Sequence, residues 1–152
     1  MTIVVDSPTH LTDAVGQTAT GDWYEITQDR IAAFADATED WQWIHLDAER
    51  ATSGPFGTTI AHGYLTLSLL PRLTSGLLSV AGTAMVVNYG LDRVRFLQPV
   101  PSGSRVRAVT EIAAVESAPQ GYRVSLTTTV ELEGSERPAL VAQTVGLFVP
   151  EA

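Results

Sequence analysis

An acid and a histidine lie five positions apart in the segment Asp40-Trp41-Gln42-Trp43-Ile44-His45-Leu46-Asp47. A carboxylate that loses water through contact with Trp41 and Trp43 becomes more basic, and an imidazole carries protons near neutral pH. The pair Asp40 and His45 is therefore suited to hold and activate a water molecule. The spacing also fits an ordinary alternative, in which Asp40 ends a helix and His45 makes a hydrogen bond within the core.

A second candidate segment, Ile60-Ala61-His62-Gly63, stands directly before a long apolar stretch. If a helix begins here, its free backbone N–H groups favour negative charge. Gly63 has no side chain to keep a substrate carbonyl away from its N–H, which is what an oxyanion hole requires. The alternative is that Gly63 only permits close helix packing, with His62 as a structural hydrogen-bonding residue.

The elements that must position these residues begin with helices. Thr27 is a good N-cap for an amphipathic helix over 28–38, and Asp47 can cap a short turn through Ala51. From Gly63 to about Val80 the apolar residues cover every side, which predicts a helix buried all round and kinked or divided at Pro71. Weaker patterns predict a short helix over 9–15 and a bent strand over 17–26.

The rest of the chain is predicted to be strand. Apolar and polar residues alternate with a period of two, and turns at 118–121 and 134–137 separate an antiparallel meander of strands at 104–116, 121–133 and 139–149. Two shorter strands are expected at 84–89 and 92–96. Helices followed by such strands indicate an α+β hot-dog fold, an antiparallel sheet wrapped around a long central helix. Another α+β sheet with helices on one side fits the same periodicity.

Composition excludes several kinds of chemistry. The 152 residues are 45% hydrophobic and 17% charged and include no cysteine, and all nine basic residues are arginine. Thiol nucleophiles, disulfides, Schiff bases on lysine and P-loop lysines are therefore ruled out. A net charge of −8 argues against nucleic acid as a partner. We expect one domain over 1–152 and, because no secretory or membrane pattern is seen, a cytoplasmic protein.

The two candidate segments together resemble the MaoC-like dehydratases, the family of (R)-specific enoyl-CoA hydratases. The family pattern Asp-x-Asn-Pro-(Ile/Leu)-His-x-Asp, followed by His-Gly after an apolar and a variable residue, is matched by Asp40, Ile44, His45, Asp47 and His62-Gly63. Gln42 and Trp43 replace the usual Asn and Pro. These two changes, with Asn88-Tyr89-Gly90 and Val94-Arg95-Phe96, resemble the NodN-like branch. The likeness runs from about Thr27 onward.

The resemblance implies a hot-dog homodimer that adds water to a trans-2-enoyl thioester, or removes it from an (R)-3-hydroxyacyl thioester. Asp40 and His45 would hold the water and move its proton, with Asp40 favoured as base, while the N–H of Gly63 would receive the thioester oxygen. We expect no cofactor and no metal. The residues expected to bind substrate are Trp41, Gln42, Ile60, His62, Arg93 and Arg95.

Arg93 and Arg95 are included because a coenzyme A thioester carries phosphate charges that an acidic protein repels overall. Together with Arg105 and Arg107 they lie at spacings of two, so each pair projects from one strand face. The alternative is that these arginines are solvated strand residues that balance nearby glutamates, and this explanation is the favoured one.

Other functions remain open on the sequence alone. A hot-dog thioesterase binds the same substrates, but the acid and histidine pair fits a hydratase better. A metal hydrolase built on Asp40, His45 and His62 lacks the usual helical spacing of ligand pairs. A non-catalytic acyl-thioester-binding protein would not need Asp40 and His45.

Overall fold

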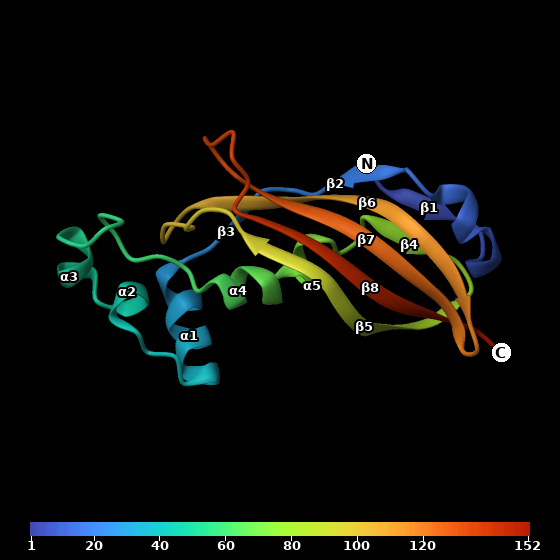
Figure 1. Ribbon diagram of the computed structural model, residues 1–152, viewed down its shortest axis with the longest axis horizontal. Coiled ribbons are helices and arrows are strands. Elements are labelled where there is room, and N and C mark those ends of the chain that lie inside the picture. The colour runs from blue at the N-terminus through green and yellow to red at the C-terminus, as the bar shows by residue number, and fades with distance from the viewer.

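A curved antiparallel sheet takes up most of the chain from Thr83 onward (Figure 1) in the computed structural model, which describes residues 1–152. The strand order is β2-β6-β7-β8-β5, and β3 pairs with β6 beside β2. The strands are β2 Thr18–Thr20, β3 Tyr24–Glu25, β5 Thr83–Phe96, β6 Arg105–Ala118, β7 Gly121–Leu132 and β8 Leu140–Pro150. The predicted meander is confirmed, because β6 pairs with β7 and β7 with β8, all antiparallel.

One face of this sheet is the main wall of the core. Val106 and Ile112 on β6, and Val124 and Val130 on β7, are completely buried. Successive side chains of a strand point to opposite faces, so the alternation in the sequence places these residues together against the helices. The central strands therefore form where the period of two is clearest.

The predicted central helix is shorter than expected and is divided. It consists of α4, Gly63–Ser68, and α5, Leu70–Leu73, and Pro71 lies in the first turn of α5, where its missing N–H costs nothing. Residues 78–80 form strand β4, which pairs in parallel with β1, Ile3–Val5. The helix is also not buried all round, because Tyr64 on α4 is 70% exposed.

The segments before α1 run along the sheet from one end to the other (Figure 1). A 3₁₀ helix, η1, replaces the predicted helix over 9–15 and spans Pro8–Ala14. The expected bent strand over 17–26 is present as the two short strands β2 and β3 on β6. Strand β1 was not predicted, since three residues are too few to show a period.

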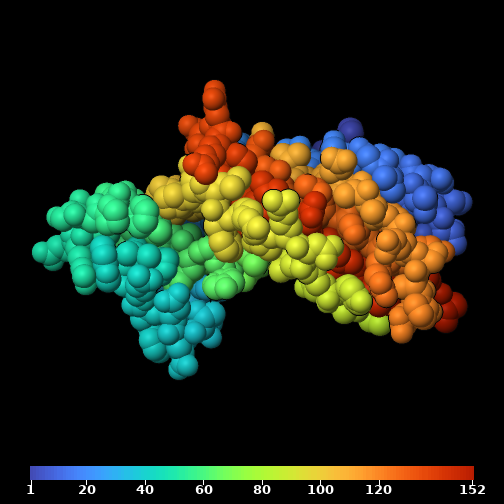
Figure 2. Space-filling model, viewed as in Figure 1, coloured from blue at the N-terminus to red at the C-terminus, as the bar shows by residue number.

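Three short helices project beyond the end of the sheet where β3 lies (Figures 1 and 2). They are α1 Gln28–Thr38, α2 Trp43–Leu46 and α3 Ala48–Thr52. Both predicted caps are present, because the Thr27 side chain accepts a hydrogen bond from the Arg30 N–H and the Asp47 side chain accepts one from the Arg50 N–H. Helix α2 lies within the candidate segment 40–47, for which no helix was predicted.

Strand β5 is the exposed edge of the sheet. The two strands expected at 84–89 and 92–96 are one strand with register shifts near Asn88 and Leu91. Most of its residues are exposed, including large apolar ones: Met85, Val86, Val87, Tyr89, Leu91 and Phe96. No helix in the structure is long and apolar enough to cross a membrane.

Candidate active site

Asp40 is placed by the end of α1. Glu39, the C-cap residue, has a left-handed backbone with φ of 59°, which few residues other than glycine adopt. Both Glu39 and Asp40 donate their N–H to the carbonyl of Ala35. The chain therefore turns sharply at Glu39 and leaves Asp40 beside the histidines, with its side chain half exposed.

His45 is held by α2 and by the segment that leads into α4. Its Nδ1 donates a hydrogen bond to the carbonyl of Ile60 at 2.7 Å, so in the neutral ring Nε2 carries the free lone pair. Burial lowers the pKa of His45 below its usual 6.5. The Ile60 carbonyl and the charge of Asp40 oppose this pKa shift, whereas the charge of His62 adds to it. A neutral His45 is therefore favoured at neutral pH.

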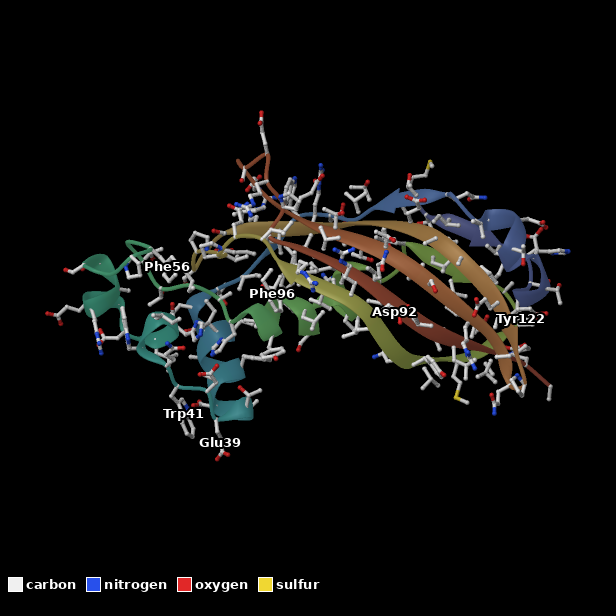
Figure 3. All side chains as sticks on the ribbon, in the orientation of Figure 1. Glu39, Trp41, Phe56, Asp92, Phe96 and Tyr122 are labelled. Atoms are coloured by element: carbon white, nitrogen blue, oxygen red, sulfur yellow. The ribbon has the colours of Figure 1, made fainter.

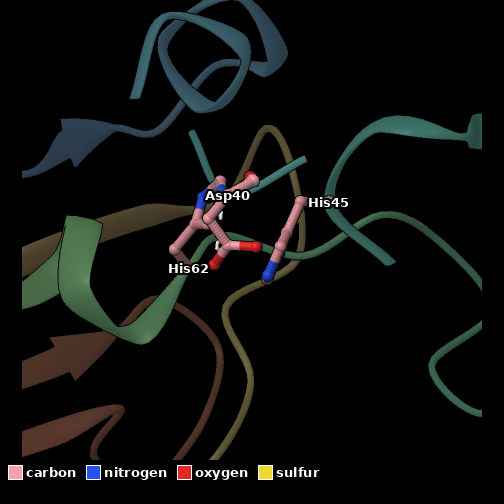
Figure 4. A group of neighbouring side chains, drawn as sticks. All are labelled: Asp40, His45 and His62. Atoms are coloured by element: carbon pink, nitrogen blue, oxygen red, sulfur yellow. Dashed lines mark hydrogen bonds and ion pairs between the residues drawn. The ribbon is translucent and has the colours of Figure 1, made fainter. Parts of the chain in front are cut away.

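His62 lies against His45. The two rings stack with centroids 3.7 Å apart and planes 23° apart, and His62 is 2% exposed. Its Nε2 donates to the backbone carbonyl of Asp40 at 3.0 Å, while its Nδ1 is buried without a partner. Figure 4 shows the side chains of Asp40, His45 and His62 gathered at one point. Because His62 is so deeply buried, its position favours a role in supporting Asp40 and His45 over direct contact with substrate.

Gly63 follows His62 and is the first residue of α4. Its N–H has no acceptor within the helix, and the His62 side chain does not cap it. A Cβ at Gly63 would lie 3.1 Å from the ring of Phe96 on β5, so this position has no room for a side chain unless Phe96 moves. Close packing and an available N–H, offered as alternatives from the sequence, are both properties of Gly63.

The two tryptophans do not shield Asp40 in the single chain, contrary to the prediction. Trp41 is 55% exposed, donates to Asp36 and points away from the sheet (Figure 3). The ring of Trp43 is stacked under the guanidinium of Arg50, 4.1 Å from the ring centroid. The sequence places them near Asp40, but the turn at the end of α1 and the start of α2 direct their rings elsewhere.

Two other residues expected to bind substrate contribute through their backbone. Gln42 is exposed, and its carbonyl accepts the N–H of His45 at the start of α2. Ile60 is 8% exposed, and its carbonyl fixes the ring of His45. Both therefore orient His45 in this structure.

The four arginines fall into two pairs. Arg105 pairs with Glu133 and Arg107 with Glu131, as the favoured alternative expected. Arg93 and Arg95 make no ion pair. Their strand partners are Gln143 and Val141, whereas the inward-facing Val94 pairs with the buried Ala142. Arg93 and Arg95 therefore lie on the outer face of the sheet, away from the face that carries α4.

Asp40, His45 and His62 are also candidate metal ligands, because one ligand atom of each lies within 4.8 Å of the others. A metal binds an imidazole nitrogen along its lone pair, in the plane of the ring. Two stacked rings direct their lone pairs along nearly parallel planes, so one ion cannot lie in both at bonding distance. The arrangement suits water and a proton better than a shared metal.

Sequence reasoning missed residues that hold the site together. Gln28 and Thr59 make hydrogen bonds that link α1, α2 and the segment before α4, and Phe96 packs on Gly63. A glutamine at a helix start and a threonine in a loop give no signal on their own. Phe96 belongs to the motif Val94-Arg95-Phe96 that resembles the NodN-like branch, but nothing in the sequence indicates that it contacts Gly63.

Comparison with known proteins agrees with this geometry. A family model described as "MaoC like domain" matches residues 11–134. The chain is 52% identical over 138 residues to 3-hydroxyacyl-thioester dehydratase Z of Mycobacterium tuberculosis, covering 90% of this chain and 89% of that protein. It is 44% identical over 150 residues to Nodulation protein N of Rhizobium leguminosarum bv. viciae, covering 95% and 90% of the two chains.

A solved structure gives the same result for the fold. The unliganded R-hydratase PhaJ1 of Pseudomonas aeruginosa superposes with a TM-score of 0.73 at 27% identity, covering 91% of this chain and 83% of that one. This likeness confirms the predicted hot-dog fold. With its family model, its relatives and its fold in agreement, the chain belongs to the MaoC-like family.

Proposed function

We propose that the protein is a hydro-lyase, an (R)-specific enoyl-CoA hydratase that adds water reversibly to a trans-2-enoyl thioester. One observation carries the proposal: the carboxylate of Asp40 and a ring nitrogen of His45 lie within 4.8 Å of each other, and the residue after His62, which stacks on His45, is Gly63 with its uncapped N–H. The dehydratase and hydratase names of the relatives support the same reaction class.

Each of these groups has a defined task. Asp40 takes a proton from water as the water oxygen bonds to C3 of the enoyl thioester. The C2=C3 electrons move toward the thioester oxygen, where the N–H of Gly63 stabilises the negative charge that develops. His45 Nε2 orients the water and relays the proton that finally bonds to C2. The reverse sequence removes water from the 3-hydroxyacyl thioester.

We further propose that two copies of this single domain assemble through β5. An exposed apolar edge strand is a template for pairing with another strand, and β5 exposes Val86, Val87 and Leu91. Near the site, Tyr64 and Phe96 are 70% and 50% exposed, so a second copy would also supply the missing apolar wall. Light scattering should report a dimer, and Val87→Asp should shift it toward monomer. A stable wild-type monomer would contradict the assembly.

The direct test is the loss of the conjugated enoyl absorbance when the purified protein meets short, medium and long enoyl-CoA substrates. Wild type should consume at least one of them. Asp40→Asn and His45→Ala should each lower kcat by about 10²- to 10⁴-fold, the usual contribution of acid–base groups. Hydrolysis to free coenzyme A would identify a thioesterase. A wild type inactive on all chain lengths, or variants as active as wild type, would contradict the proposal.

We expect the reaction to need no cofactor besides the coenzyme A thioester itself. Treatment with a chelator should leave kcat unchanged, because the stacked histidines are unsuited to one shared ion. A loss of activity that is restored by added metal would instead support the alternative function of a metal hydrolase. The cytoplasmic location stays a prediction from the sequence.

A further inference from the structure

Gln28 contacts the site from outside the catalytic set. It is the first residue of α1, and its side chain reaches across to α2 and to the segment before α4. Its Nε2 donates to the carbonyl of His45 at 2.8 Å, and its Oε1 accepts from the hydroxyl of Thr59 at 2.7 Å. Thr59 is 4% exposed. Both ends of the amide are therefore used.

These bonds extend a set of contacts between two short stretches of chain. The N–H of Ile60 donates to the carbonyl of Ile44 at 3.0 Å, and the carbonyl of Ile60 accepts from Nδ1 of His45 at 2.7 Å. Residues 44–45 and 59–60 are thus joined directly by two bonds, and Gln28 joins the same stretches through a third route. The ring of His45 turns only if this set of contacts changes.

We propose that Gln28 and Thr59 are positioning residues that fix the tautomer of His45. By holding the His45 backbone against residues 59–60, they keep Nδ1–H on the carbonyl of Ile60. Nε2 then keeps its lone pair free to accept a hydrogen bond from the water of the proposed reaction. This inference rests on the proposed function, because it assigns His45 the task of orienting water.

The chemistry of the position calls for an amide. An amide donates at one end and accepts at the other, and it carries no charge at any working pH. A carboxylate would set an acceptor against the carbonyl of His45, with no proton to share. A protonated carboxylic acid restores the pattern, because its O–H donates and its C=O accepts. Glutamate at position 28 should therefore work only when protonated.

The test compares Gln28→Glu with wild type from pH 5 to pH 8 by kcat and KM. At pH 8 the variant should lose kcat by about 10-fold or more, the effect of a slightly misplaced catalytic group, while KM changes little. As the pH falls, the ratio of variant to wild-type kcat should rise toward one. Gln28→Met should lower kcat by a similar factor at every pH, and Thr59→Val by less.

Gln120→Glu is the matched control, since it adds the same charge in the turn between β6 and β7, away from the site. It should follow wild type at every pH. Two titratable groups, Asp40 and His62, act on His45 through their charges. Both are present in all variants, so they cannot produce a difference in pH dependence between Gln28→Glu and wild type. Only the proton on residue 28 changes the pattern of donors and acceptors.

A second readout does not depend on activity. Nitrogen NMR of the histidine side chains reports which ring nitrogen carries the proton. His45 should hold its proton on Nδ1 in wild type and in Gln120→Glu, and should become a mixture of tautomers in Gln28→Met. An unchanged tautomer in Gln28→Met, or a Gln28→Glu ratio that stays flat with pH, would overturn the inference. An inactive wild type with the expected tautomer would instead count against the proposed function.

Discussion

The sheet and the junction of α1, α2 and α4 are held by different kinds of contact. In the sheet, side chains such as Ile112 and Val130 are fully buried among apolar neighbours. At the junction, side chains bond to backbone: His45 to Ile60, His62 to Asp40 and Gln28 to His45. Apolar burial has no direction, whereas a hydrogen bond fixes an angle. The sheet therefore supplies stability, and the junction supplies orientation.

The largest effect expected from this comparison is on stability. Ile112→Ala, in the sheet on β6, should lower the free energy of unfolding by about 2–5 kcal/mol, and Ile112→Val by about 0.5–1.5 kcal/mol. The kcat of the remaining folded protein should not change. Urea unfolding and an assay at low temperature measure the two quantities. A large fall in kcat would show that the regions are not separable in this way.

The next effect is on rate at the junction. Gly63→Ala should lower kcat by up to about 10-fold, because the new Cβ meets the Phe96 ring at 3.1 Å and the N–H shifts by a few tenths of an ångström when the two are forced together. The loss of stability should stay small. Phe96→Ala should restore much of the lost kcat when it is combined with Gly63→Ala, since it removes the ring that the Cβ meets. Failure of the double variant to recover would mean that Gly63 acts in some other way.

The pH dependence of stability sharpens the comparison further. The pKa of His45 is lowered in the folded protein, so below pH 6.5 the unfolded chain binds more protons than the folded one. The contribution of His45 to the free energy of unfolding is constant above pH 6.5 and is lost as the pH falls toward the lowered pKa. Between pH 7.5 and pH 5.5, wild type should lose more unfolding free energy than His45→Gln, by up to about 1.4 kcal/mol per pH unit. If the unfolding free energy of wild type and of His45→Gln fell equally with pH, the pKa of His45 would not be lowered by folding.

The smallest effects concern the arginines of the sheet. Arg95→Ala should raise KM for a coenzyme A substrate a few-fold, more at low salt, if this unpaired cation meets the nucleotide phosphates. Arg107→Ala is its control, because Arg107 already pairs with Glu131, and it should change stability by at most about 1 kcal/mol and leave KM unchanged. Equal KM values for both variants would leave Arg95 as a solvated strand residue.

The sequence by itself determined the elements whose residues follow a period or carry a cap. The alternation over 121–133 predicts β7, and Thr27 predicts the start of α1 at Gln28. These signals are local, so a single stretch of chain contains all the information. The motif likewise indicated Asp40, His45 and Gly63, because the family resemblance resides in neighbouring residues.

Tertiary structure decided what these residues touch. The central helix ends before residues 78–80 because these residues pair with the distant strand β1, and the exposure of β5 likewise depends on how the whole sheet is assembled. Gln28 and Thr59 meet across 31 positions, and no local pattern marks either of them. The physical reason is that a period or a cap acts within a few residues, whereas the orientation of His45 depends on partners that only folding brings together.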